Sequence, residues 1–270
     1  MIMELSQFIA QYGLVLLFLA MAGAALELDS YFIGVSLLSQ PIIAGGIAGF
    51  ILGDIGNGIY IGAIVQLIWL MPPVGAYVPP SAAAITIVAT ATSVLLKQHL
   101  PEYTADSVNM YSVIGGACVG YFMGQMDIWN RKFNTRIMKF FEPGILKGRD
   151  TCILGIMSFA VLAKYLRDFL VYFGFMALGI PLAEKILVTL PPQVLKAFQL
   201  SFAFLPVLGF AVIFDIFVNK VGGIFHGIAF VGVFVLLKLR PDTDVLFLFI
   251  VLLCAGFIVV YNAVWNRRQA

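Results

Sequence analysis

Two polar side chains stand inside an otherwise apolar stretch of the chain. Gln66 lies within the apolar run 59–70, and Ser81 directly follows the double proline Pro79-Pro80. An amide and a hydroxyl each donate and accept hydrogen bonds, so they suit recognition of a neutral polar ligand. The alternatives are structural. Gln66 can bond a neighbouring helix, a contact worth about 0.6 kcal/mol in membranes, and Ser81 can cap the helix that follows it.

Five further residues near this stretch carry ligand-binding groups. Trp69 and Tyr77 can stack on the apolar face of a ring, although packing or an interfacial position is the alternative. Asp54 follows a glycine at an expected helix end, where it either contacts a ligand or caps the next helix. Glu27 and Asp29 close the first apolar run, where they line an entrance or are solvated loop charges.

A second polar group lies in the middle of the chain. Lys164, Arg167 and Asp168 share one face of an expected helix, at spacings i, i+3 and i+4. They either pair with one another or attract a phosphorylated partner. An ion-coupled transporter would need an intramembrane carboxylate, and Asp54 and Asp215 occur in no evident motif for that. No arrangement of nucleophile and base indicates an enzyme.

Composition sets the class of protein. Of the 270 residues, 61% are hydrophobic and 11% are charged, and the mean hydropathy is +1.01. The apolar runs have helical length, so we expect an all-α polytopic membrane protein with about seven to nine transmembrane or re-entrant helices, forming a single domain, 1–270. No basic patch is interleaved with aromatic residues as in nucleic-acid binders. The three cysteines have no pair spacing, and no metal or cofactor is indicated.

The stretch 41–93 predicts an intramembrane hairpin. The run 59–70 would span roughly 18 Å as a helix and the run 81–96 about 24 Å, both less than the ~30 Å hydrocarbon core. Between them, 71–80 contains four prolines and cannot be helical throughout. Irregular backbone at membrane depth needs protein or a wet cavity around it, and interrupted helices mark substrate sites in transporters. We therefore expect 26–96 to form a substrate-site core with a re-entrant hairpin.

The remaining apolar runs predict the other helices. They lie at 8–26, 31–52 (with Pro41 within it), 108–126, 151–180 (ended by Pro181), 198–218, 222–237 and 244–264. The stretch 182–197 is expected to be a short interfacial connector. The first run lacks the preceding basic segment of a cleaved signal peptide, so we expect it to remain as a span.

Basic residues concentrate in 127–150. Six occur there: Arg131, Lys132, Arg136, Lys139, Lys147 and Arg149. By the positive-inside rule this segment is predicted to be a cytoplasmic loop, with Trp129 as an interface anchor. A docking site for a phosphoprotein would also need basic groups there.

An ordered set of motifs runs through the central stretch: Leu28-Asp29-Ser30, Pro41, Gly49-Phe50-Ile51-Leu52-Gly53-Asp54, Gly58, Gly62 and Val74-Gly75-Ala76-Tyr77-Val78-Pro79-Pro80. Further motifs follow at Pro192, Pro206 and Gly209-Phe210-Ala211. With these motifs the chain resembles the IIC membrane subunit of the mannose/fructose/sorbose family of the bacterial sugar phosphotransferase system (PTS). The resemblance covers most of the chain and is strongest over 26–93.

The resemblance implies a function. Such subunits are sugar permeases of the bacterial inner membrane that pair with a IID membrane subunit and oligomerise. An elevator-like movement carries a hexose-type sugar across the bilayer, and the cytoplasmic IIA and IIB phosphocarrier proteins supply phosphate to it. The IIC subunit carries no phosphorylated residue, and this chain has only His99 and His226 and no phosphate-binding glycine loop. The expected substrate-binding residues are Gln66, Ser81, Asp54, Trp69, Tyr77, Glu27 and Asp29.

The sequence also departs from the family pattern. Gln66 stands where a glutamate is common, Ser81 where Pro-Asp is usual, and Gln40 where an arginine often precedes the proline. Amides and hydroxyls keep the hydrogen bonds that a neutral sugar needs but remove charge. Two functions therefore stay open at this point: a working permease subunit, or a transport-inactive regulatory or scaffold paralogue.

Overall fold

The computed structural model describes residues 4–29, 36–69, 80–146 and 150–217. This part of the chain contains seven helices and no strand. The chain divides into two compact units, Met1–Phe210 and Ala211–Ala270. Of the second unit, the structure describes only residues 211–217, which end a helix. Tyr77, the proline-rich tip and the helices expected at 222–237 and 244–264 also lie outside them. A single domain over the whole length stays a prediction.

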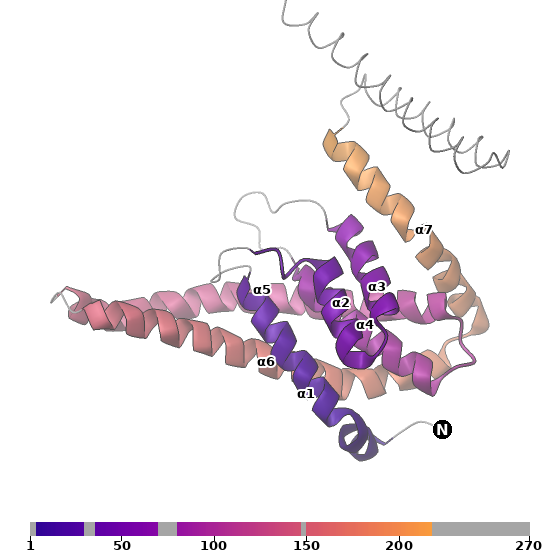
Figure 1. Cartoon of the computed structure of the whole chain (residues 1–270), viewed down its shortest axis with the longest axis horizontal. Coiled ribbons are helices and arrows are strands. Elements are labelled where there is room, and N and C mark those ends of the chain that lie inside the picture. The colour runs from indigo at the N-terminus through magenta and orange to yellow at the C-terminus, as the bar shows by residue number, and fades with distance from the viewer. Residues whose placement is uncertain (1–3, 30–35, 70–79, 147–149, 218–270) are drawn as a thin grey trace, which may run out of the picture. The chain divides into compact units, whose positions relative to one another are not determined.

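The first two helices differ from the predicted ranges. Helix α1 covers Leu5–Asp29, and α2 covers Pro41–Leu52 (Figure 1). The prediction of a helix over 31–52 with Pro41 inside it is wrong, because Pro41 is the first residue of α2 and residues 36–40 form a turn. Proline lacks an N–H and disfavours helical backbone in the residue before it, so the first helical position suits it best.

The predicted break after α2 is confirmed. Gly53 ends α2 in the left-handed region, with φ 78°. The next residue, Asp54, donates its backbone N–H to Gly49 O at 2.8 Å, which closes the C-terminal turn. The Asp54 carboxylate then accepts the N–H of Asn57 at 3.1 Å and caps α3, Ile55–Ile68.

Helices α2 and α3 pack backbone against backbone. A Cβ built on Gly45 would collide with the carbonyl oxygen of Gly58, and one on Gly58 would collide with the carbonyl oxygen of Gly45. A Cβ on Gly62 would lie 2.5 Å from the carbonyl oxygen of Pro41. Small residues allow this close approach, as at other helix contacts in membranes.

Helix α4, Ala82–His99, lies at the centre of this unit. Every residue from Ala83 to Leu96 is buried. A helix that is buried all round must be enclosed by neighbours, and α1, α2, α3, α5 and α6 all contact it. With 14 and 18 residues, α3 and α4 are about 21 and 27 Å long, close to the predicted lengths. Their re-entry into the membrane stays a prediction.

Two long helices replace several predicted short segments. Helix α5 covers Ala105–Ile145 and α6 covers Asp150–Thr189. Figure 1 shows them extending together beyond the shorter helices α2, α3 and α4. The prediction of a loop over 127–150 is therefore wrong for residues 127–145, which are helical. Its cationic residues have long unbranched side chains, which favour helix. The cytoplasmic position of this segment stays a prediction.

The end of α6 was also placed too early. Pro181 lies inside α6, which continues to Thr189, and α7 covers Pro192–Phe217. The predicted connector 182–197 is therefore mostly helix. An internal proline costs one backbone hydrogen bond, but neighbouring helices often compensate in membrane proteins, and Pro181 is buried here.

Two described helices are long and apolar enough to cross a membrane by length and composition. They are Leu5–Asp29 and the stretch Ile153–Thr189, whereas α2 and α3 are apolar but shorter. The main apolar core joins α1, α4 and α6 through side chains that include Leu16, Ile87 and Tyr172.

Gly58→Ala is expected to destabilise the protein by about 1–3 kcal/mol, the usual cost of overpacking. The added methyl group would meet the backbone of Gly45, which has no side chain that could move away. Gly56→Ala is the matched control in the same helix, because its Cβ would meet only an Asp54 oxygen at 3.9 Å. Thermal unfolding in detergent measures both variants. Equal melting temperatures would show that the close contact does not limit stability.

Candidate functional site

Glu27 connects three helices. It lies near the end of α1 with 4% of its surface exposed. The Ser81 hydroxyl donates a hydrogen bond to its Oε1, and the Tyr172 hydroxyl donates to the same oxygen at 3.0 Å. Ser81 also accepts the N–H of Ala84 at 3.1 Å and so caps α4, as predicted. The structure therefore brings together two residues predicted for the site, Glu27 and Ser81, and adds Tyr172 of α6.

Asp29 fixes the turn that leads into α2. One carboxylate oxygen accepts the backbone N–H of Ser36 at 2.9 Å and its hydroxyl at 2.5 Å, and the other accepts the N–H of Ser39 at 3.2 Å. Only 2% of Asp29 is exposed. The interpretation of Glu27 and Asp29 as solvated loop charges is therefore wrong. Both carboxylates are buried and hydrogen-bonded, as buried polar groups must be.

Gln66 contacts a residue that the motif analysis had singled out separately. Its side-chain amide donates a hydrogen bond to the Gln40 side-chain oxygen at 2.7 Å. Gln40 immediately precedes α2, whereas Gln66 lies near the end of α3. The Oε1 atom of Gln66 is buried and accepts no hydrogen bond from any residue in the described part of the chain. An acceptor in this state can take a hydrogen bond from a ligand hydroxyl.

Asp54 and Trp69 lie at opposite ends of α3. Asp54 caps the start of that helix, roughly 18 Å along the axis from Gln66. Trp69 ends the helix, three residues after Gln66, and is half-buried against an apolar cluster that includes Ile64 and Phe202. The structure thus places Trp69 near the Gln40–Gln66 contact and Asp54 far from it.

Four charged side chains form a buried network between α5 and α6. The Lys164 ammonium lies 3.0 Å from Asp127 and 2.9 Å from Asp168. The Arg167 guanidinium lies 2.7 Å from Asp127 and 2.5 Å from Asp168, and it also donates to the Met126 carbonyl at 2.7 Å. The predicted pairing among Lys164, Arg167 and Asp168 is confirmed. Two cations facing two carboxylates balance in formal charge.

The residues that sequence reasoning missed are Asp127, Tyr172 and the role of Gln40 as a partner. Lys164, Asp168 and Tyr172 are four residues apart in turn, so they lie along one face of α6. That spacing could have drawn attention to Tyr172. It could not have shown that Glu27, 145 residues away, would accept its hydrogen bond.

Two more polar groups are internally satisfied. Asn57 donates to Ser93 at 3.0 Å, Ser93 donates to Asn109 at 2.5 Å, and Lys97 donates to Asn57 at 2.7 Å. These bonds join α3, α4 and α5. Because each group has a partner, we interpret the cluster as a helix contact.

His99 forms the second of these groups. One of its ring nitrogens lies 3.0 Å from the Tyr12 hydroxyl and the other 3.3 Å from Glu184. The contacts join α1, α4 and α6.

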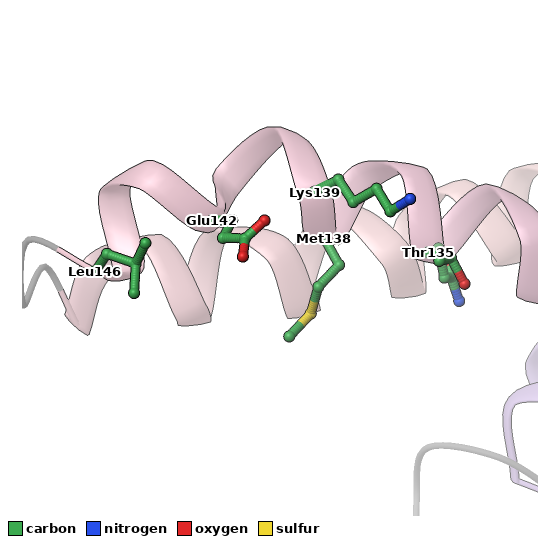
Figure 2. A pocket seen from close by; sticks show the side chains of 6 residues that line it. Thr135, Met138, Lys139, Glu142 and Leu146 are labelled. Atoms are coloured by element: carbon green, nitrogen blue, oxygen red, sulfur yellow. The ribbon is translucent and has the colours of Figure 1, made fainter.

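Two further kinds of site were sought. In the described ranges, no group of three or more His, Cys, Asp or Glu residues could hold a metal ion. An open groove of about 620 Å³ lies beside α5 (Figure 2). None of the predicted site residues lines it. Its lining consists of Asn134, Thr135, Met138, Lys139, Glu142 and Leu146.

Comparison with known families gives one match over most of the chain. Residues 9–261 match the family model described as the PTS system sorbose-specific IIC component. The resemblance seen in the central motifs is thereby confirmed, and it extends well beyond them.

Individual proteins are related more distantly. The chain is 22% identical over 208 residues to the "Fructose permease IIC component" of Bacillus subtilis (strain 168), which covers 76% of this chain and 71% of the relative. It is 33% identical over 64 residues to the "Putative N-acetylgalactosamine permease IIC component 2" of Escherichia coli (strain K12), which covers 23% of this chain and 48% of that protein. A solved structure described as "Structure of membrane protein" matches with a TM-score of 0.63 and 20% identity over 95% of both chains, and supports the fold.

Asp168→Asn is expected to destabilise the protein by about 3–5 kcal/mol, the usual cost of breaking a buried ion pair from one side. It would leave Lys164 and Arg167 facing the single carboxylate of Asp127. The control is Glu102→Gln, which neutralises an exposed carboxylate. Thermal unfolding in detergent compares them. If both variants unfolded at the same temperature, the network would not be a source of stability.

Proposed function

This chain belongs to the family of PTS sorbose-specific IIC components, which are sugar permease subunits, and from this premise we propose that it moves a hexose-type sugar across the bacterial inner membrane. Membership implies a membrane protein that works with a sugar and with other PTS proteins. The finer proposal is that it pairs with a IID membrane subunit and oligomerises. A cytoplasmic IIB protein, itself supplied by IIA, then transfers phosphate to the sugar.

The single observation that supports a sugar site best is the amide contact between α2 and α3. The Gln66 oxygen is buried beside Gln40 and accepts no hydrogen bond from the described residues. A sugar hydroxyl can both donate to that oxygen and accept from an amide N–H, so one hydroxyl fits the pair. We therefore place the sugar at this contact, with Gln66 as the main hydrogen-bonding residue.

Neighbouring residues complete the proposed site. Trp69 lies one turn after Gln66, where its ring is suited to stack on the C–H face of a sugar, and Tyr77 is proposed for the same role. Ser81 caps α4, so the positive end of that helix would face the sugar. Glu27 holds Ser81, and Asp29 holds the turn before α2, so both act by positioning. Asp54 is assigned to capping.

The membrane arrangement follows from the same premise. We propose that α3 and α4 form a re-entrant hairpin, because about 21 and 27 Å are both short of the hydrocarbon core. We also propose that the chain crosses the membrane several times. The basic end of α5 is placed on the cytoplasmic side by the positive-inside rule.

Phosphate chemistry is assigned to the partner proteins. Both ring nitrogens of His99 lie within hydrogen-bond distance of partners, Tyr12 and Glu184. A phosphate acceptor needs a free ring nitrogen, so this histidine is suited to packing. The chain would then contribute sugar binding and translocation.

A second candidate is a transport-inactive paralogue with a regulatory or scaffold role. One specific contact favours it. Gln40 and Gln66 touch each other, and the family resemblance leads us to expect an arginine and a glutamate at these two positions. In this chain the two residues touch but carry no charge. Sugar accumulation by the reconstituted complex would exclude this candidate, and complex formation without any accumulation would support it.

Gln66→Leu is expected to weaken sugar binding roughly two- to tenfold, the value of one hydrogen bond. The isobutyl group has a similar size but cannot bond a hydroxyl. Gln98→Leu, at an exposed position of α4, is the control. Phosphoenolpyruvate-dependent uptake is measured after coexpression with the IID, IIA and IIB partners, as a function of sugar concentration. An unchanged apparent KM in the Gln66 variant would remove Gln66 from the site.

A further inference from the structure

The outer half of α5, residues 128–145, follows Asp127 of the buried ion-pair network and exposes a row of cations. Its members are the exposed side chains of Arg131, Lys132, Arg136 and Lys139. At 100° per residue they fall within about 140° of the helix circumference. None of them forms an ion pair with any residue that the structure describes. Four such positive charges on one side of a helix create a positive potential, which attracts an anionic partner.

Exposed aromatic side chains lie beside this row. Trp129, Phe133 and Phe140 are 71%, 42% and 80% exposed, and they fall within about 40° of one another around the helix. The outer half of α6, next along the chain, also exposes large apolar groups, including Leu154 at 68% and Met157 at 59%. A basic row bordered by tryptophan and phenylalanine is typical of helices that lie in the membrane interface.

The length of the helices places these groups at the edge of the bilayer. With 40 residues, α6 is about 60 Å long, roughly twice the hydrocarbon thickness. The outer halves begin beyond the buried ion-pair network of Asp127, Lys164, Arg167 and Asp168. Cations are costly inside hydrocarbon, and exposed aromatic groups are unfavourable in water. The interface accommodates both.

The groove beside α5 adds a second observation (Figure 2). Among its lining residues, Asn134 has a buried Oδ1 atom with no hydrogen-bond partner in the described part of the chain. Lys139 lines the same groove and supplies a cation, Met138 and Leu146 supply apolar surface, and Glu142 supplies one carboxylate. A molecule with a phosphate, a hydroxyl and an acyl chain matches these three features. The phosphate suits the Lys139 cation, the hydroxyl suits the unpaired Asn134 oxygen, and the acyl chain suits the apolar lining.

We propose that residues 129–142 of α5 form a binding surface for anionic phospholipids, with phosphatidylglycerol as the matching chemistry. Its phosphate would pair with the cations, and its glycerol hydroxyl would donate to Asn134. A site for a phosphoprotein would converge several donors on one phosphate. These cations instead extend over about 12 Å of the helix axis, as suits a row of headgroups.

The test uses Trp129 as a reporter of the neighbouring lipid. The full chain, with Trp69→Phe and Trp265→Phe, is reconstituted together with its membrane partner subunit into vesicles of phosphatidylcholine and phosphatidylglycerol. The same complex with Trp129→Phe added gives the emission of the partner's tryptophans, which is subtracted. In one set only the phosphatidylglycerol carries bromine on its acyl chains, and in the other only the phosphatidylcholine. At equal mole fractions, brominated phosphatidylglycerol should quench Trp129 more strongly, because the basic row enriches it.

Two matched double variants identify the cause. Arg136→Gln with Lys139→Gln should reduce the enrichment by up to roughly 25-fold, at about fivefold per cation. Lys185→Gln with Lys196→Gln removes two exposed cations from other helices and should leave the enrichment unchanged. With all four cations of the row in place, the enrichment should also fall as the salt concentration is raised, because salt screens the attraction between the cations and the anionic headgroups.

Two results would overturn the proposal. Equal quenching by the two brominated lipids would show that the surface does not select anionic lipid. Absence of quenching by either would show that the surface does not contact lipid, because the membrane partner covers it or because it lies in water. The readout needs no sugar transport, so it can succeed or fail independently of the proposed permease function.

Discussion

A carboxylate buried among apolar helices must be hydrogen-bonded, and this constraint is concentrated at Glu27. Its side chain accepts from Ser81 of α4 and Tyr172 of α6 while it belongs to α1 itself. If either partner moved away, a buried acceptor would lose its hydrogen bond at a cost of about 1–3 kcal/mol. The start of α4 is therefore held to α1 and, through Glu27, to α6. Helix α4 in turn packs against α2 and α3, the two helices next to the Gln40–Gln66 contact.

The same principle organises the rest of the described unit. Along one face of α6, Lys164 and Asp168 belong to the ion-pair network and Tyr172 belongs to the Glu27 contact. One face of α6 thus contacts α5 through Asp127 and α1 through Glu27. Polar groups that would be costly in an apolar interior instead specify which helices meet. The surfaces that face outward, by contrast, are free to carry recognition, as along the outer part of α5.

Local chemistry could be predicted from the sequence, and long-range contacts could not. The glycine break at Gly53 and the caps by Asp54 and Ser81 depend on residues one to three positions away, so their signals are short. Family membership also followed from ordered motifs. Pro181 was misjudged, because neighbouring helices decide whether a proline ends a helix or is accommodated inside it. The Gln40–Gln66 and Glu27–Tyr172 contacts join residues 26 and 145 positions apart, and no spacing rule reaches that far.

The contact between α2 and α3 has a mechanical consequence. Gly45 and Gly58 bring two backbones together with no side chain between them. Sliding of one helix over another normally proceeds through small rotamer adjustments in the layer between them, and this pair has no such layer at its closest point. The two helices are therefore suited to shift as one rigid body, carrying Gln40 and Gln66 with them. Any rearrangement that sugar passage requires would be taken up at the outer borders of the pair, and the amide contact would travel intact.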